Sequence, residues 1–277
     1  MFNLIIADTI GSTYEGGDLK GFSLPLLPKG SHFTDDSVLM AATAEVILLK
    51  RASGSDLSQI SSEDFARSYK NWGRRFPGVG YSPQFKSWLS KDSLSPIYSL
   101  GSGAVSRALP IAWCSQSEET VLALAEASAL ASHDSTEAVN GAKAVTHAIH
   151  KLIKGDEVES VRSFIEGLYF VKLSYNWEEL HQESGFSTNA EDCAGLGLAI
   201  GLTAKNIEDA MRLCLYVGGD TDTIGAIAAA VMDARQPDVT MPEIFLKVKE
   251  AMTGSYAKEI WDIASQYQDE VMYSRHG

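Results

Sequence analysis

Apolar residues recur three and four positions apart along most of the chain, which is the spacing that forms one face of an α-helix. Segment 35–50 shows this pattern clearly and is rich in Ala, Leu and Met, which favour helix. The same spacing predicts further helices at 118–131, 136–153, 157–170, 206–217 and 256–270. The sequence has no long run in which apolar and polar residues alternate, as a half-buried strand would require. The pattern therefore predicts an all-α protein.

Residues that commonly cap helices mark several of the predicted helix starts. Ser117 and Asn189 each precede a predicted helix, and their side-chain oxygens can accept a hydrogen bond from a free backbone N–H of the first turn. Thr240 and Glu243 have the spacing of a capping box, with Pro242 inside the first turn. We therefore expect helices to begin after Ser117, Asn189 and Thr240.

Gly, Ser and Pro gather in the segments between the helical patterns, which predicts loops at 11–33, 73–103 and 183–190. No internal repeat, low-complexity tract or linker interrupts the sequence. We therefore expect a single compact domain over residues 1–277, with functional loops on one face.

The net charge of the chain argues against one class of binding partner. Asp and Glu outnumber Lys and Arg by 36 to 23, which gives a formal net charge of −13. A protein that binds a nucleic-acid backbone usually needs a basic face. Because no cluster of Lys and Arg is visible, we do not expect a nucleic-acid partner.

The first residues and the cysteines favour a cytoplasmic protein. The start MFNLIIADTIG has no basic region, and Asp8 interrupts its apolar run, so we expect neither a signal peptide nor a membrane span. Cys114, Cys193 and Cys214 have spacings that fit neither a zinc site nor a disulfide framework. We interpret them as small core residues in a reducing compartment.

Three acidic segments stand apart from the other charged positions. The first contains Asp8 and Glu15, the second is Thr-Asp-Asp at 34–36, and the third is Gly-Gly-Asp-Thr-Asp-Thr at 218–223. The second and third segments each lie directly before an apolar helix. Both therefore have an ordinary explanation, because Thr and Asp cap helices and acidic side chains favour the positive end of the helix dipole.

Taken together, the second and third segments also suit a metal site. Their Asp carboxylates precede helices that are apolar on nearly all faces, so they should lose solvation and need a compensating partner. Mg²⁺ binds carboxylate and hydroxyl oxygens, and two ions sharing Asp ligands would form a two-metal hydrolytic site. Neither segment itself contains His, which argues against zinc, copper or iron. From spacing and chemistry alone, a metal site and a pair of helix caps remain equal alternatives.

The chain resembles the ADP-ribosylglycohydrolases. The resemblance rests on Thr-Asp-Asp-Ser at 34–37, on GGDTDTIGA at 218–226, and on an acidic, glycine-rich stretch that ends in Glu15. The segment Gly101–Arg107 is similar to the family's Gly-Asn-Gly segment ending in Met-Arg, and the segment Ser132–His133 is similar to a Thr-His stretch before a helix.

The resemblance implies an all-α fold whose cleft holds two Mg²⁺ ions, or Mn²⁺ in some members. The metal ligands that it implies are Thr34, Asp35, Asp36, Asp220, Asp222 and Thr223. Glu15 matches an acidic residue implicated in catalysis in some members, and Asp36 is the second catalytic candidate. The loop that lies against the ADP-ribose phosphates is matched by Gly101, Ser102 and Gly103. His133 matches a residue that lies near the bound ligand in the family.

The resemblance runs from about residue 2 to 235, and three positions within it depart from the family pattern. The family usually has Gly-Asp where this chain has Ala7 followed by Asp8. Ser102 replaces the Asn of Gly-Asn-Gly, and Ser106 replaces the Met before Arg107. All implied metal ligands are retained, so the departures bear on substrate preference and affinity.

The activity implied by the resemblance is metal-dependent removal of ADP-ribose from a modified partner. The bond cleaved would join the distal ribose to a protein side chain, with arginine as the first candidate and serine as the second, or to a group in a small molecule. Two other readings stay open. One is a homologue that binds ADP-ribose or has a structural role without turnover. The other is a two-metal phosphohydrolase, which would cleave the pyrophosphate and release AMP.

Overall fold

The computed structural model describes residues 1–183, 187–237 and 239–273, and the part of the chain that it describes is helical, with isolated β-bridges and no β-strand. The helices are α1 (Phe2–Gly11), α2 (Asp35–Ala52), α3 (Ser62–Arg75), α4 (Pro83–Ser90), α5 (Gly103–Ser106), α6 (Glu118–Leu130), α7 (Thr136–Ile153), α8 (Val158–Tyr169), α9 (Trp177–Gln182), α10 (Ala190–Thr203), α11 (Ile207–Val217), α12 (Thr221–Arg235), α13 (Pro242–Thr253) and α14 (Lys258–Tyr267). This confirms the predicted all-α class.

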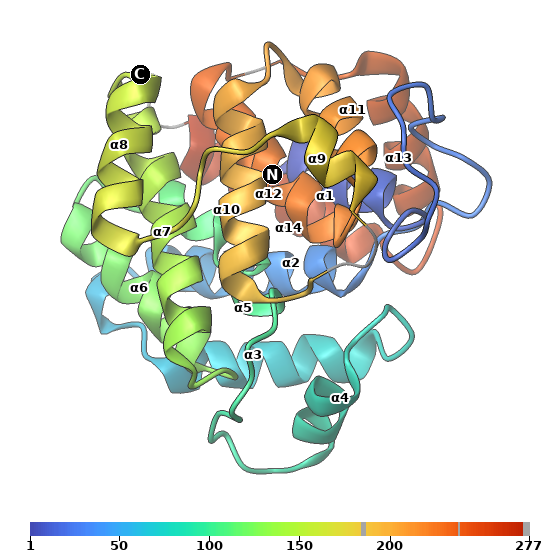
Figure 1. The fold of residues 1–277 in the computed structure, drawn as a ribbon. Coiled ribbons are helices and arrows are strands. Elements are labelled where there is room, and N and C mark those ends of the chain that lie inside the picture. Colours follow the sequence, from blue (N-terminus) through green and yellow to red (C-terminus); the bar gives the residue numbers. More distant parts are fainter. Residues whose placement is uncertain (184–186, 238, 274–277) are drawn as a thin grey trace.

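Helices α1 and α12 form the centre of the molecule (Figure 1). Every residue of α12 from Thr221 to Met232 is buried, and α1 is buried from Asn3 to Gly11. The two helices are therefore core helices without a solvated face, as the apolar segment after residue 223 predicts. Their paired ends fix where the flanking loops can lie.

Helix α10 packs on α12 at positions where its residues are small. A Cβ added to Gly201 would lie 2.5 Å from the Cβ of Val231, closer than real carbon atoms approach. The absent side chain therefore lets the two backbones come together, and α7 and α11 also pack against α12.

The predicted helix starts are mostly confirmed. The side chains of Ser117 and Asn189 accept hydrogen bonds from first-turn N–H groups of α6 and α10. The capping box expected at Thr240 and Glu243 is wrong, because Met241 is the residue that precedes α13 and no side chain caps that helix. Pro242 does begin this helix, and its lack of an N–H leaves one fewer donor to cap.

The predicted loops contain more structure than the composition indicates. The segment 73–103 includes the end of α3 and all of α4, and its aromatic residues Tyr81, Phe85 and Trp88 are buried. Of the predicted loop 183–190, residues 184–186 lie outside the described part of the chain. Helix α1 also begins earlier than any helix that the sequence pattern predicted.

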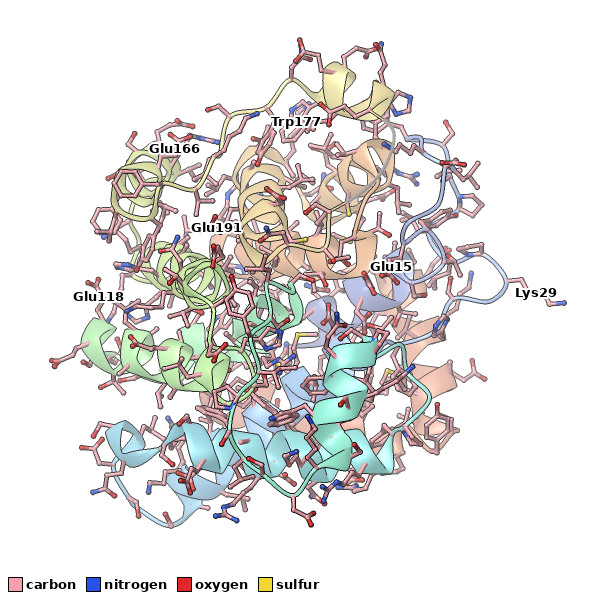
Figure 2. The ribbon with its side chains drawn as sticks, turned by 60° about the horizontal axis from the view of Figure 1, so that its bottom comes forward. Glu15, Lys29, Glu118, Glu166, Trp177 and Glu191 are labelled. Carbon is pink, nitrogen blue, oxygen red and sulfur yellow. The ribbon has the colours of Figure 1, made fainter. Side chains whose placement is uncertain are left out.

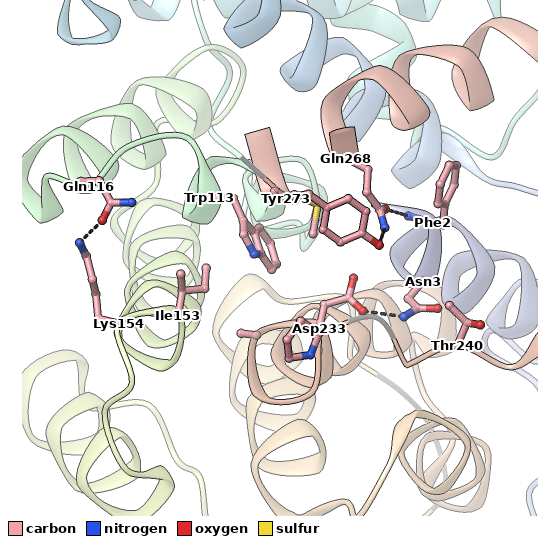
Figure 3. Close-up of a pocket in the computed structure, with 13 residues that line it drawn as sticks. Phe2, Asn3, Trp113, Gln116, Ile153, Lys154, Asp233, Thr240, Gln268 and Tyr273 are labelled. Carbon is pink, nitrogen blue, oxygen red and sulfur yellow. Dashed lines mark hydrogen bonds between the residues drawn. The ribbon is translucent and has the colours of Figure 1, made fainter. Parts of the chain in front are cut away.

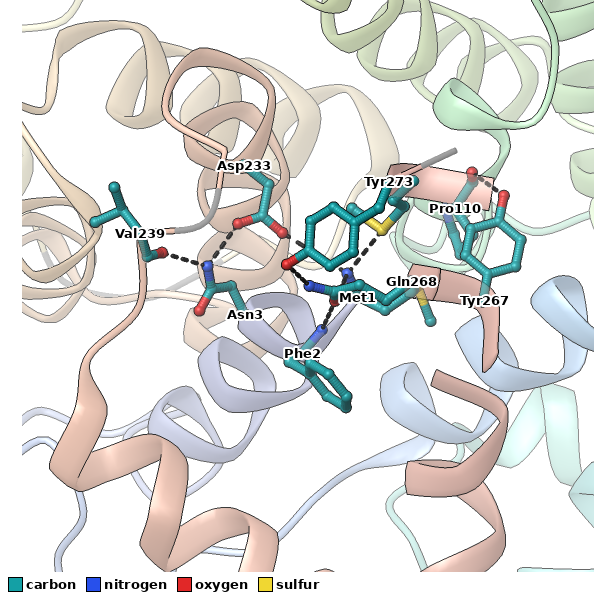
Figure 4. A network of polar contacts seen from close by, with 10 residues as sticks. Met1, Phe2, Asn3, Pro110, Asp233, Val239, Tyr267, Gln268 and Tyr273 are labelled. Atoms are coloured by element: carbon teal, nitrogen blue, oxygen red, sulfur yellow. Dashed lines mark hydrogen bonds and ion pairs between the residues drawn. The ribbon is translucent and has the colours of Figure 1, made fainter. Parts of the chain in front are cut away.

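A polar network joins the start of α1 to the C-terminal part of the fold (Figure 4). The Asn3 amide donates to the carboxylate of Asp233, at 2.6 Å, and to the carbonyl of Val239, at 2.8 Å. The Gln268 side chain accepts the N–H of Phe2 at 3.2 Å. Helices α1 and α12 are thus held at one pair of ends, and the opposite pair of ends carries the acidic segments.

Among the described residues, no helix combines the length and the apolar character needed to cross a membrane.

Candidate functional site

The three acidic segments meet in one pocket of about 260 Å³. It lies where α1 ends and where α2 and α12 begin, so three segments distant in the sequence contribute to it. Every residue proposed from the sequence lines this pocket: Glu15, Thr34, Asp35, Asp36, Gly101, Ser102, Gly103, His133, Asp220, Asp222 and Thr223.

Asp36 is the most firmly held carboxylate of the second segment. It lies in the first turn of α2, where the Thr34 side chain caps the helix by accepting the Asp36 N–H at 3.2 Å. Its Oδ1 accepts a short hydrogen bond from the Ser106 hydroxyl, and its Oδ2 accepts one from the Thr223 hydroxyl at 2.7 Å. Asp36 thus joins the start of α2 to both α5 and α12.

Asp220 and Asp222 are presented by the turn between α11 and α12. Gly218 and Gly219 have φ values of 79° and 98°, a region that side-chain-bearing residues rarely adopt, so this tight turn requires glycine. Asp220 Oδ2 accepts hydrogen bonds from the Ser102 hydroxyl at 2.7 Å and the Cys193 thiol at 3.3 Å. The turn therefore aims two carboxylates into the pocket beside α5.

Glu15 lies just after α1, at the start of the N-terminal loop (Figure 2). One carboxylate oxygen from each of Glu15, Asp220 and Asp222 lies within 4.8 Å of the others. Glu15 is the exposed member of this group, whereas the two Asp residues are buried. The first and third acidic segments therefore face each other across the pocket.

Asp8 has a different role from Glu15, although the sequence groups them together. It is fully buried and is absent from the residues that line the pocket. Its carboxylate accepts the N–H of Thr34 at 2.9 Å, the hydroxyl of Thr34 at 2.6 Å, and both the N–H and the hydroxyl of Ser37. Asp8 therefore anchors the start of α2 to α1.

The pocket concentrates negative charge in a buried space. Burial, with repulsion from neighbouring carboxylates, raises the pKa of Asp36 and of Asp222 well above the ordinary value, and burial raises the pKa of Asp35 to about 7. Burial and the charge of Asp220 also raise the pKa of Glu15. Such a set of carboxylates is stabilised by protons or by cations.

Arg107 is a buried residue of the pocket whose importance the sequence did not reveal. Its guanidinium lies between the rings of Tyr69 and Phe85, 5.1 and 4.9 Å from their centroids. It donates to the carbonyl of Gly103, and to the hydroxyl of Ser132 at 2.5 Å. Its charge opposes the rise in the pKa of Asp35. Only the motif match ending in Arg107 could have indicated it.

The glycine-rich loop before α5 and His133, in the turn between α6 and α7, both line the pocket. Gly101 forms an isolated β-bridge with Asn189, and the Ser102 N–H donates to the carbonyl of Thr188 at 2.8 Å. His133 is buried, and its Nδ1 lies 2.9 Å from the Ser132 hydroxyl. Burial, with the nearby Arg107 charge, lowers the pKa of His133 well below the ordinary value, so the ring is neutral at pH 7.

A second cavity of about 260 Å³ lies at the other ends of α1 and α12 (Figure 3). Trp113, Lys154 and Asp233 are among its lining residues. The Lys154 ammonium is bonded to the Gln116 side chain, and Asp233 is bonded to Asn3. The crowded carboxylates lie in the first pocket, so we assign the chemistry to that pocket.

Comparison with known families identifies the fold and the class of activity. A sequence model of the ADP-ribosylglycohydrolase family matches residues 1–267. The chain belongs to this family. The match continues beyond residue 235, where we expected the resemblance to end, and it includes α13 and α14. Membership in the ADP-ribosylglycohydrolase family indicates a hydrolase of ADP-ribose linkages.

A structural comparison agrees on the fold. A solved chain described as "ADP-ribosylglycohydrolase-related protein complex" superposes with a TM-score of 0.69 and 20% sequence identity, over 95% of this chain and 93% of that chain. At this identity the likeness shows a shared fold. No curated protein matches the sequence.

Proposed function

We propose that this ADP-ribosylglycohydrolase releases ADP-ribose from a modified protein, using two Mg²⁺ ions, for which Mn²⁺ can substitute. One observation carries the proposal: acid-and-hydroxyl segments from three distant parts of the chain line one pocket together with the glycine-rich loop. The proposed ligands are Thr34, Asp35, Asp36, Asp220, Asp222 and Thr223.

The donor atoms in the pocket suit a hard cation. The six proposed ligands offer carboxylate and hydroxyl oxygens, which Mg²⁺ and Mn²⁺ prefer, and the pocket-lining His32 and His133 are not among them. The Cys193 sulfur, which contacts Asp220, is a poor ligand, because burial and the adjacent Asp220 raise the pKa of its thiol well above the ordinary value. The thiol therefore stays protonated and acts as a hydrogen-bond donor to Asp220.

The glycine-rich loop and His133 form the part of the pocket proposed to bind the substrate. The Gly103 backbone N–H can approach phosphate oxygens closely, because glycine has no side chain to obstruct it, whereas the Gly101 N–H donates to the Ser99 hydroxyl at 3.2 Å. The neutral ring of His133 can share a hydrogen bond with the ligand without adding charge. The ADP-ribose would then extend from this loop towards Glu15 and the Asp cluster.

The proposed reaction is hydrolysis at the anomeric carbon of the distal ribose. The oxygen of a water molecule forms a bond to this carbon, the bond to the side-chain N or O breaks, and the water proton passes through a carboxylate to the leaving atom. Glu15, at the exposed edge, is the first candidate to carry the proton, and Asp36 is the second. Bound divalent cations would supply Lewis acidity and hold ribose hydroxyls.

Positive charge that develops on the ribose in the transition state is offset by the surrounding carboxylates. Arginine-linked ADP-ribose is the first proposed substrate, and serine-linked ADP-ribose is the second. We also propose that the reaction takes place in the cytoplasm, on a target without a nucleic-acid backbone.

A panel of substrates with known ADP-ribose linkages tests the activity. We expect free ADP-ribose to be released in the presence of Mg²⁺, and release to stop after treatment with EDTA. AMP as the product would instead identify a pyrophosphohydrolase. Binding of ADP-ribose with no turnover of any linkage would identify a silent homologue.

The ligand set is tested by Asp222→Ala. We expect this variant to lose both turnover and the rise in melting temperature on addition of Mg²⁺, since a cation that binds the folded state alone stabilises it. The control is Asp262→Ala, which removes an exposed carboxylate paired with Lys258. A normal Mg²⁺ response in Asp222→Ala would refute the proposed ligand set.

A further inference from the structure

Helix α5 is a single turn that places two hydroxyl groups side by side. Ser102 precedes the helix and Ser106 ends it, and the N–H of Ser106 donates to the carbonyl of Ser102 at 3.3 Å. Residues four apart on a helical turn lie on the same face. Both hydroxyls therefore face the acidic segments, Ser102 from the lining of the pocket and Ser106 from a fully buried position beside it.

Each hydroxyl donates to a different carboxylate. The Ser102 hydroxyl lies 2.7 Å from Asp220 Oδ2, and the Ser106 hydroxyl bonds to Asp36 Oδ1. The two serines are 7% and 0% exposed, so water does not compete for these contacts. One turn of helix thus contacts both acidic segments, at the start of α2 and at the start of α12.

The remaining contacts fix the orientation of both carboxylates. Asp36 is held through its second oxygen by the Thr223 hydroxyl. Asp220 Oδ2 accepts hydrogen bonds from both the Cys193 thiol and the Ser102 hydroxyl, so two donors fix this oxygen. Rotation of either carboxylate would break at least one of these bonds.

The turn that carries the serines is itself held in place. The Arg107 guanidinium bonds to the Gly103 carbonyl on one side and to the Ser132 hydroxyl on the other. The Ser102 backbone is also tied to Thr188. These contacts therefore fix the positions of the two hydroxyl groups.

We propose that Ser102 and Ser106 are positioning residues that hold the Asp220 and Asp36 carboxylates in their cation-binding orientation. This inference rests on the proposed function. The common family pattern has Asn and Met at these two positions, so the paired hydroxyls distinguish this chain. Groups that orient ligating side chains typically contribute about 10- to 100-fold to metal affinity.

The test measures the Kd of Mg²⁺ by calorimetry for Ser102→Ala, Ser106→Ala and the double variant. Each single variant should bind Mg²⁺ about 10- to 100-fold more weakly. The two effects should multiply, because the serines contact separate carboxylates. Ser102→Thr, which keeps the hydroxyl, should restore the affinity. The matched control is Ser128→Ala, a buried serine whose hydroxyl bonds to the Tyr69 phenol instead of a carboxylate.

Circular dichroism of each variant checks that it folds. If Ser106→Ala does not fold, Ser106→Cys serves in its place, since it preserves the packing and is only a weak donor. If the wild-type protein binds Mg²⁺ and the serine variants bind it with the same Kd, this inference is overturned. The proposed function then remains intact. Wild-type protein that binds neither Mg²⁺ nor Mn²⁺ would overturn both.

Discussion

Single residues in this protein show how burial decides what a titratable group does. Asp8 and Glu15 belong to one acidic stretch of sequence, yet Asp8 is buried and accepts hydrogen bonds from Thr34 and Ser37, whereas Glu15 lines the pocket. His147 is a third example, outside the site. Its ring is buried, its Nδ1 lies 2.9 Å from the Tyr169 hydroxyl, and its Nε2 lies 3.2 Å from the Glu118 carboxylate.

Folding stability should therefore depend on pH through His147. Burial lowers the pKa of His147 below its ordinary value of 6.5, although Glu118 acts in the opposite direction. As the pH falls through 6.5, the unfolded chain takes up a proton that the folded chain resists, so the free energy of unfolding decreases. We expect His147→Gln to lose this part of the pH dependence in urea unfolding between about pH 7.5 and 5.5. Parallel curves for the two proteins would contradict this assignment.

At the scale of helices, the small residues of α10 set how closely it packs on α12. Gly201→Ala should lower the free energy of unfolding by about 1–3 kcal/mol, because the added methyl group meets Val231. Gly167 in α8 is the matched control, since a Cβ there meets no atom within 4 Å. Gly167→Ala should raise the free energy of unfolding by about 0.5–1 kcal/mol. Urea titration of both variants measures the difference, and equal effects would contradict the packing argument.

Helices were the features of the structure that the sequence predicted best. The three-and-four spacing of apolar residues predicted α2, α6, α7 and α8, because that pattern depends on local chain geometry alone. The expected capping box at Thr240 failed, because a cap depends on the path of the chain before the helix. The contacts of Ser102 and Ser106 were not predictable from the sequence, because they depend on how α5 is turned towards α2 and α12.

At the scale of the whole molecule, the pocket joins the ends of central helices that the rest of the fold surrounds. The residues that the family resemblance proposes as metal ligands all line this pocket. Arg107 was missed because its burial between Tyr69 and Phe85 arises from packing of α3, α4 and α5.

Because three segments contribute to the pocket, Mg²⁺ should rigidify them together. We expect amide hydrogen exchange to slow at 12–16, 34–37 and 218–223 on addition of Mg²⁺, since a bound cation opposes local opening of each. Helix α8 contributes no residue to the lining of the pocket, so hydrogen exchange in α8 should not change on addition of Mg²⁺. Protection confined to one of the three segments would show that the cation does not join them.

The pairing of α1 with α12 also has a consequence for how the protein is made. The carboxylates of Asp35 and Asp36 cannot meet those of Asp220 and Asp222 until the turn at Gly218 and Gly219 has left the ribosome, because that turn and α12 supply the second half of the pocket. Until then, the carboxylates of the first two acidic segments lack the third segment that would complete a cation site. A nascent chain halted before residue 218 should bind no divalent cation, so the pocket comes into being only late in translation.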